Sequence, residues 1–192
     1  LAGVPAALVC DDPARMPDCD LVVEMAHPDY TRRYGESILA RADYLPLSVT
    51  ALADDALRER LVARAQAAGT HLAIPHGALM GLDSLHEWRH MWSEVTITFE
   101  KHPASIDFAE SGIDPRSVAG RTVVYDGPVR GIAPRFPRNV NTMVTCALAT
   151  IGLDRCRAVL IADPSLDKAY AEIEAKGLDG SRIATWNEQP AT

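Results

Sequence analysis

The sequence predicts an α/β fold, with an open parallel sheet in its first part and a mixed sheet with helices in its second part. Two observations predict this. Short β-branched runs alternate with helical patterns at the spacing of parallel βαβ units as far as Pro75, and the pattern changes near Gly77. The 192 residues, 47% hydrophobic and 23% charged, are enough to bury a sizeable core in one domain or two small ones.

Strands and helices alternate in the first part. The run 20–26 is apolar and β-branched, and it ends at His27-Pro28. The helix predicted over 53–68 has acidic residues in its first turn and Gly69 directly after it. The strands expected here are 6–10, 20–26, 44–49 and 71–75, and the helices are 30–42 and 53–68. Because ligands bind at the carboxyl ends of such strands, the candidate ligand-binding segments are 26–27, 50–51 and 76–78.

The second part predicts strands around one apolar helix. Residues 95–100 alternate as a strand does, and residues 109–121, which contain two glycines and a proline, predict a surface connection. The further expected elements are a helix at 84–91, strands at 123–126 and 158–162, and a strand or helix at 169–175. A mixed sheet with helices on one side is the simplest packing for this set.

The segment 142–151 has no charged side chain, so a helix there must be buried nearly all round. Asn139 and Asn141 stand just before it. The N–H groups at the start of a buried helix favour an anionic or amide-bearing ligand in front of these two amides. The alternative is an asparagine that only caps the helix.

Composition and charge exclude several classes of protein. A net charge of -7 without a basic cluster argues against a nucleic-acid-binding surface. No apolar run approaches the roughly 20 residues that cross a bilayer, and no export signal opens the chain. The four cysteines form no C-x-x-C pair, which favours a reducing cytoplasm.

One motif predicts a different chemistry. The segment 86–90 matches H-E-x-x-H, which on a helix would place His86 and His90 on one face as in a zinc peptidase. A zinc hydrolase is therefore one alternative, and a solvated amphipathic turn is the other. No glycine-rich phosphate-binding motif is present in the 192 residues.

Six stretches together resemble the L-aspartate dehydrogenase family, in family order and at about family spacing. They are Asp20-Leu21-Val22-Val23-Glu24-Met25-Ala26, Ser48-Val49-Thr50-Ala51-Leu52-Ala53-Asp54, Ile74-Pro75-His76-Gly77-Ala78, Gly81-Leu82-Asp83, Phe136-Pro137-Arg138-Asn139-Val140-Asn141 and Ile161-Ala162-Asp163-Pro164.

The resemblance implies a partial Rossmann-type dinucleotide-binding domain at 1–76 and an α/β domain at 77–192 for substrate and dimer contacts. The family's glycine-rich unit is then expected before Leu1, and further residues after Thr192. The implied reaction oxidises L-aspartate to the imino acid with NAD or NADP and feeds NAD biosynthesis. The implied partners are an amino-acid substrate and a second copy of the chain. Ala78 and Asn141 match the family's contacts to the nicotinamide dinucleotide.

Three positions depart from the family pattern. Thr50 stands where the family has glycine, His76 where it usually has serine, and Ala171 where it has its catalytic histidine. Alanine cannot transfer a proton. We expect His76 to replace the missing histidine, because its imidazole lies near Ala78 in the sequence and titrates near neutral pH. The alternative is a catalytically silent relative that only binds a nucleotide or metabolite.

Overall fold

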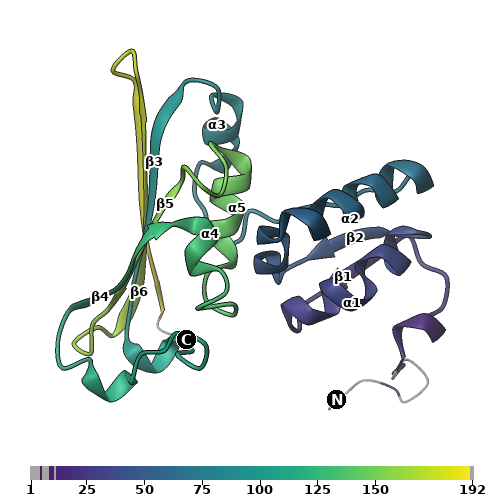
Figure 1. The fold of residues 1–192 in the computed structure, drawn as a ribbon, viewed down its shortest axis with the longest axis horizontal. Coiled ribbons are helices and arrows are strands. Elements are labelled where there is room, and N and C mark those ends of the chain that lie inside the picture. The colour runs from purple at the N-terminus through teal and green to yellow at the C-terminus, as the bar shows by residue number, and fades with distance from the viewer. Residues whose placement is uncertain (1–4, 6–8, 11, 191–192) are drawn as a thin grey trace.

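The first part of the chain is a small parallel sheet covered by helices. The computed structural model describes residues 5, 9–10 and 12–190, and shows two parts side by side (Figure 1). The elements of the first part are β1 (Leu21–Glu24), α1 (Pro28–Leu39), β2 (Asp43–Pro46), the short 3-10 helix η3 (Val49–Ala53) and α2 (Asp55–Ala68). A further 3-10 turn spans Pro13–Arg15. β1 and β2 pair in parallel, as predicted.

Local chemistry fixes the ends of the two helices. Pro28 occupies the first turn of α1, and the His27 side chain accepts a hydrogen bond from the N–H of Asp29. Asp54 caps α2 by accepting from the N–H of Leu57, and Gly69 ends it with φ of 71°. Both predicted helices are thus present, but α1 begins two residues and ends three residues earlier than predicted, and α2 begins two residues later.

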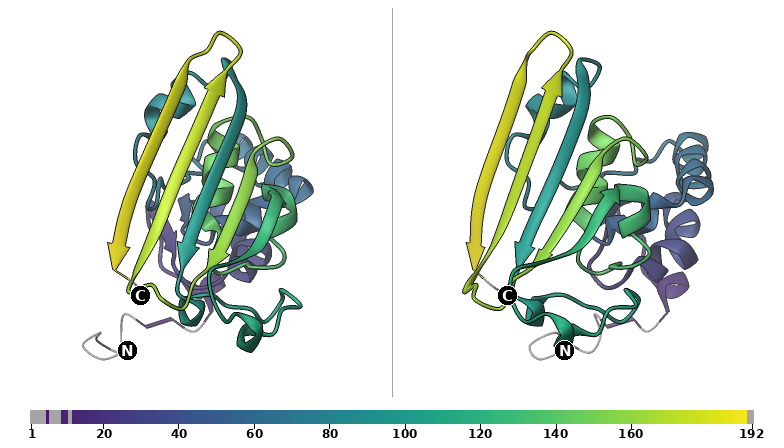
Figure 2. Two further views of the ribbon diagram at one scale, coloured as in Figure 1. Left: turned by 90° about the vertical axis from the view of Figure 1, so that its left-hand side faces the viewer. Right: turned by 60° about the vertical axis from the view of Figure 1, so that its left-hand side comes forward.

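The second part is a five-stranded mixed sheet in the order β4-β5-β3-β6-β7. β3 and β5 are parallel, and the other neighbours are antiparallel. Its elements are α3 (Leu82–Glu87), β3 (Trp92–Lys101), β4 (Thr122–Pro128), α4 (Val129–Ile132), α5 (Asn141–Ala149), β5 (Arg157–Ala162), β6 (Lys168–Gly177) and β7 (Arg182–Pro190). The connection between β3 and β4 carries two 3-10 turns, Pro103–Ser105 and Pro115–Ser117. The helices lie on one face of the sheet, and the opposite face is bare in the drawn ribbon (Figures 1 and 2).

Two predicted elements differ from the structure, and three further segments were predicted ambiguously, were not predicted, or lie largely outside the described residues. The strand predicted at 71–75 is a single bridge between Tyr44 and Leu72, because Pro75 has no N–H to extend the ladder. The helix predicted at 84–91 ends at Glu87, since the chain must turn into β3. The segment 169–175 is strand, and β7 was not predicted. Most of the strand predicted at 6–10 lies outside the described residues.

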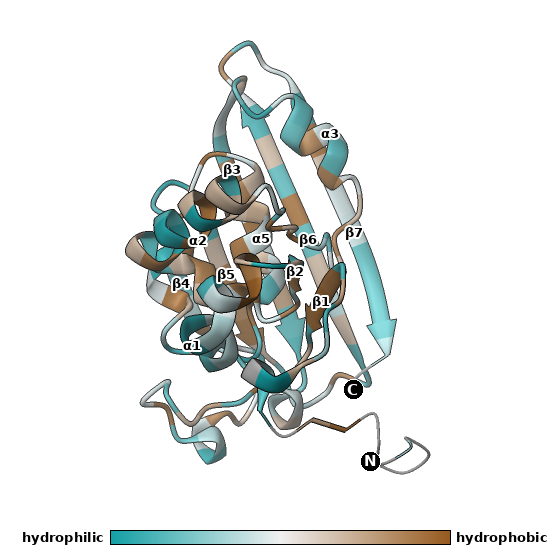
Figure 3. Ribbon diagram, turned by 90° about the vertical axis from the view of Figure 1, so that its right-hand side faces the viewer, coloured by the Kyte–Doolittle hydropathy of each residue, from teal (hydrophilic) through white to brown (hydrophobic). Residues whose placement is uncertain are grey.

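Helix α5 forms the centre of the second part. Met143, Val144, Cys146 and Ala147 have no exposed surface, as the uncharged sequence predicted. The residue that caps its N-terminus is Val140, without a side-chain hydrogen bond, so the alternative of an asparagine cap is wrong. Hydropathy colouring shows brown, apolar residues on β1, β5 and α5, whereas β7 is largely polar (Figure 3).

Two polar clusters join the two parts. The Arg130 guanidinium binds the carboxylate of Asp154 through two nitrogens at 2.5 and 2.7 Å, lies 3.0 Å from Asp55, and donates to the carbonyl of Ala53. The second cluster contains Thr50 and is described below. Among the described helices, none is both long and apolar enough to cross a membrane.

Candidate functional site

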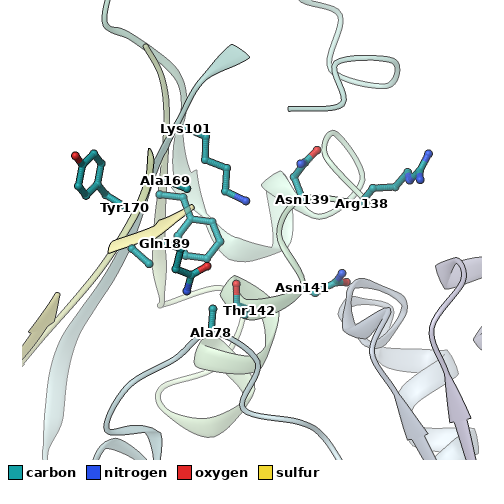
Figure 4. A pocket seen from close by; sticks show the side chains of 11 residues that line it. Ala78, Lys101, Arg138, Asn139, Asn141, Thr142, Ala169, Tyr170 and Gln189 are labelled. Atoms are coloured by element: carbon teal, nitrogen blue, oxygen red, sulfur yellow. The ribbon is translucent and has the colours of Figure 1, made fainter. Parts of the chain in front are cut away.

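A cavity of about 200 Å³ lies where the N-terminus of α5 meets the sheet. The turn after Gly77 forms one side of it, and the ends of β3, β6 and β7 form another (Figure 4). The lining residues are Ala78, Phe99, Lys101, Arg138, Asn139, Asn141, Thr142, Ala169, Tyr170, Ala171 and Gln189. The structure thus brings together Ala78 and Asn141, which lie far apart in the sequence.

A tight turn places Ala78 in this cavity. Gly77 has a φ of 60°, and a Cβ on it would lie 2.6 Å from Cγ2 of Thr142. Only glycine fits that approach without strain. The carbonyl of Ala78 then accepts a hydrogen bond of 3.3 Å from the side-chain amide of Asn187 on β7. The turn is therefore held against α5 on one side and against β7 on the other.

The amide of Asn141 is oriented by Thr50. Its Oδ1 accepts from the backbone N–H of Thr50 at 3.0 Å, and an N–H can only donate, so the amide can face only one way. The Thr50 hydroxyl lies 2.7 Å from the carbonyl of Pro137 and 3.0 Å from the same Oδ1. The NH2 group of Asn141 has no partner within residues 12–190, so it remains available to a ligand.

Asn139 has a different role. Its Oδ1 accepts from the N–H of Asp107, and its NH2 donates to the carbonyl of Ser105. Both ends of this amide are used within the chain, so Asn139 fixes the loop after β3 to the start of α5. Of the two amides predicted in front of the helix, Asn141 is the one that can contact a ligand.

Lys101 brings a positive charge to the cavity. It is the last residue of β3, and its Nζ lies 5.0 Å from the centre of the Phe99 ring (Figure 4). Burial disfavours the ammonium form and lowers the pKa of Lys101 below its ordinary value. The side chain is half-buried, so its ammonium group is partly shielded from water.

The wall beside Lys101 is apolar. Phe99 on β3 pairs with Ala171 on β6, and strand alternation places Ala169 on the same face. Tyr170 points to the opposite face, where its ring stacks on Trp186 with centroids 5.6 Å apart. At the position where the resemblance implied a catalytic histidine there is thus a methyl group, with 6% of Ala171 exposed.

His76 lies in a neighbouring cavity of about 220 Å³ between α3 and α5. Its Nε2 is 3.5 Å from a carboxylate oxygen of Asp83, and about half of its side chain is exposed. It does not line the cavity that holds Asn141. Its catalytic role stays a prediction.

The H-E-x-x-H segment does not form the geometry of a zinc site. His86 belongs to α3, but the helix ends at Glu87, so His90 is not on the same helical face. Nδ1 of His86 lies 2.9 Å from the carbonyl of Ala149. Within residues 12–190, no group of three or more His, Cys, Asp or Glu side chains could hold a metal ion.

Two polar residues on the sheet side of the cavity, Lys101 and Gln189, were not predicted from the sequence. Lys101 ends an alternating strand just before Pro103, and that position at a carboxyl end was a usable signal. Gln189 lies on β7, which the Asp179-Gly180 turn could have revealed as the return strand of a hairpin.

The comparison with solved structures defines the class of fold. Aspartate dehydrogenase from Thermotoga maritima superposes with a TM-score of 0.78 and 28% sequence identity, over 98% of this chain and 76% of that one. Residues 1–75 match the family described as homoserine dehydrogenase, NAD binding domain. The chain thus has a Rossmann-type parallel sheet followed by an α/β domain with a mixed sheet, as predicted.

Residues 85–192 match the family described as aspartate dehydrogenase, C-terminal. This chain belongs to the aspartate dehydrogenase family. It is 41% identical to an aspartate dehydrogenase domain-containing protein of Xenopus tropicalis over 165 residues, covering 82% of this chain and 58% of that protein. It is 40% identical to L-aspartate dehydrogenase 1 of Bordetella pertussis over 160 residues, covering 82% and 60%. The chain therefore spans about three fifths of these relatives.

Proposed function

We propose that the protein containing this chain oxidises L-aspartate or a related amino acid to the imino acid with NAD or NADP. The observation that carries the proposal is one cavity lined by Ala78, Asn141 and Lys101, with the Asn141 amide extending from it toward the first part (Figure 4). Family membership supports the same activity.

The residues of the cavity fit the nicotinamide end of such a cofactor. The NH2 group of Asn141 can donate to a carboxamide oxygen, and its Thr50 contacts fix its direction. The bound cofactor would accept the hydride from the substrate. Asn141 and the Ala78 turn would orient the nicotinamide ring, and a fixed orientation lowers the entropic part of the barrier.

In this proposal the two domains have different binding roles. Residues 1–76 hold the dinucleotide, and residues 77–192 hold the substrate and contact a second copy in a homodimer. The protein acts in the cytoplasm, where the imino product feeds NAD biosynthesis. Light scattering of the full-length protein at several concentrations tests the dimer, and a monomeric mass throughout would contradict it.

We further propose that His76 accepts a proton from the ammonium group of the substrate. This proton must leave before the imine can form. An imidazole nitrogen can accept a proton, and His76 lies two residues before Ala78. His76→Ala should lower kcat with L-aspartate. Unchanged turnover over the whole pH range would remove His76 from the mechanism.

The activity itself is tested by absorbance at 340 nm. The full-length protein should reduce NAD or NADP in the presence of L-aspartate, and a panel of other amino acids defines its preference. No reduction with any amino acid and either cofactor would contradict the proposed reaction.

A binding protein without turnover is the second candidate function. The apolar positions Ala169 and Ala171 favour it, because neither side chain can move a proton. This candidate predicts measurable binding of NADH by fluorescence together with no reduction in the 340 nm assay. The two results together separate it from an active dehydrogenase.

A further inference from the structure

Lys101 differs from the other two lysines of the chain. Lys168 pairs with Glu188, and Lys176 lies 3.2 Å from Glu174, both on the sheet. Lys101 makes no ion pair within residues 12–190, although it is more deeply buried than either. Partial burial of a cation without a counter-ion has a free-energy cost, because the cation gives up hydration without a compensating charge.

The acidic groups on the surrounding segments are occupied elsewhere. Glu100, the neighbour of Lys101 on β3, binds Arg121 at 2.7 Å. Asp163 after β5 accepts hydrogen bonds from Ser165, and only its backbone N–H contacts the Lys101 carbonyl. Asp107 on the following loop lies 3.8 Å from Arg138.

The ammonium points into the cavity from the sheet side, whereas Arg138 extends away from it (Figure 4). Lys101 thus supplies the positive charge inside, flanked by Phe99 and Ala169 and facing the start of α5. An anion that entered would meet a half-buried cation in partly apolar surroundings, where Coulomb attraction is stronger than in water.

We propose that Lys101 is the anchor for a carboxylate of the substrate. The proposal rests on the proposed function, because it assumes that the substrate occupies this cavity. With one carboxylate held at the end of β3, the rest of the amino acid would lie over Ala169 and Ala171, toward Asn141 on α5. The anchor thus sets which part of the substrate approaches the cofactor.

Calorimetry with ligands that cannot be oxidised tests the anchor without relying on activity. The full-length protein is titrated with succinate and with succinamide, its neutral analogue, in the absence and presence of NAD or NADP. We expect succinate to bind roughly 10- to 100-fold more tightly than succinamide, the range of a charge-assisted hydrogen bond.

Three substitutions separate charge from packing. Lys101→Met should weaken succinate binding by the same roughly 10- to 100-fold factor and leave succinamide unchanged. Lys101→Arg, which keeps the charge, should retain most of the affinity. Lys176→Met is the matched control, because it makes the same change on the sheet far from the cavity. Circular dichroism melting of each variant verifies the fold.

The outcomes distinguish this inference from the proposed function. Binding of succinate that is lost in Lys101→Met supports the anchor even if no amino acid is oxidised. Equal binding by Lys101→Met and the unsubstituted protein overturns the anchor, whatever the activity. Absence of succinate binding by the unsubstituted protein, with or without cofactor, also overturns it.

Discussion

Two asparagines two residues apart have separate tasks. The amide of Asn139 is used fully within the chain, whereas Asn141 keeps its NH2 group free. Asn141→Asp preserves an oxygen for the Thr50 contacts but removes the donor. We expect cofactor affinity to fall by roughly tenfold or more, with little change in stability. Fluorescence titration with NADH measures the affinity.

Asn139→Ala should give the opposite result. It leaves the N–H of Asp107 and the carbonyl of Ser105 without their partner, and should lower the free energy of unfolding by about 1–3 kcal/mol. An Asn141→Asp variant that binds NADH normally would contradict the assigned donor role.

Gly77 is a second residue on which the site depends. Gly77→Ala should lower the free energy of unfolding by more than the roughly 1–2 kcal/mol of a left-handed backbone alone, because its Cβ meets Thr142. Gly112→Ala is the matched control, since Gly112 has a φ of 74° with no atom near the added Cβ. Urea unfolding measures both.

A second variant isolates the clash at Gly77. Thr142→Ser removes the Cγ2 atom and should restore part of the stability lost in Gly77→Ala. Equal losses in the two Thr142 backgrounds would show that the contact with Thr142 is unimportant.

At the scale of elements, Arg130 on α4 connects α2 to the loop before β5. Its guanidinium holds the pKa of Asp154 below the ordinary value, and Arg58 and then Arg130 do the same for Asp55. A carboxyl whose pKa is depressed by folding stabilises the protein above its unfolded pKa, and this contribution is lost as the pH falls through the folded pKa.

The free energy of unfolding should therefore decrease as the pH falls below the ordinary aspartate pKa of 3.8, and decrease less in Arg130→Met. Urea unfolding at a series of pH values measures this. Arg89→Met is the control, because Arg89 donates to the carbonyl of His86 and pairs with no carboxylate among residues 12–190. Identical pH dependence in Arg130→Met and the unsubstituted chain would refute the role of Arg130.

A helix or strand was predictable from the sequence where the residues that fix its ends lie within or next to that element. Caps and turn residues within the segment fix α1 and α2, so the sequence predicted both helices, with ends displaced by up to three residues. The bridge at Leu72 and the early end of α3 depend on the neighbouring β2 and on the start of β3. The sequence pattern of one segment does not show which strand lies next to that segment in the fold.

At the scale of the whole molecule, the two parts should unfold as one unit, because Thr50, Arg130 and the apolar contact of η3 with α5 join them. All three tryptophans lie in the second part, and the long helices α1 and α2 lie in the first. Tryptophan fluorescence and far-ultraviolet circular dichroism should thus give coincident unfolding transitions.

The double variant Thr50→Val with Arg130→Met should separate these transitions, because it removes hydrogen bonds across the junction and leaves each core intact. Thr96→Val is the control for the first change, since the Thr96 hydroxyl makes no hydrogen bond within residues 12–190. Two separate transitions in the unsubstituted chain would contradict the coupling.

The sequence by itself determined the α/β class, the buried helix after Asn141, and the family, because periodicity, caps and short motifs are local properties of the chain. The tertiary structure decided which residues meet. It placed Ala78 with Asn141, gave Thr50 the task of orienting that amide, and left Lys101 beside Ala169 with no counter-ion in the described part of the chain. These contacts join residues up to 91 positions apart, and only the packing of α5 between the two parts brings them together.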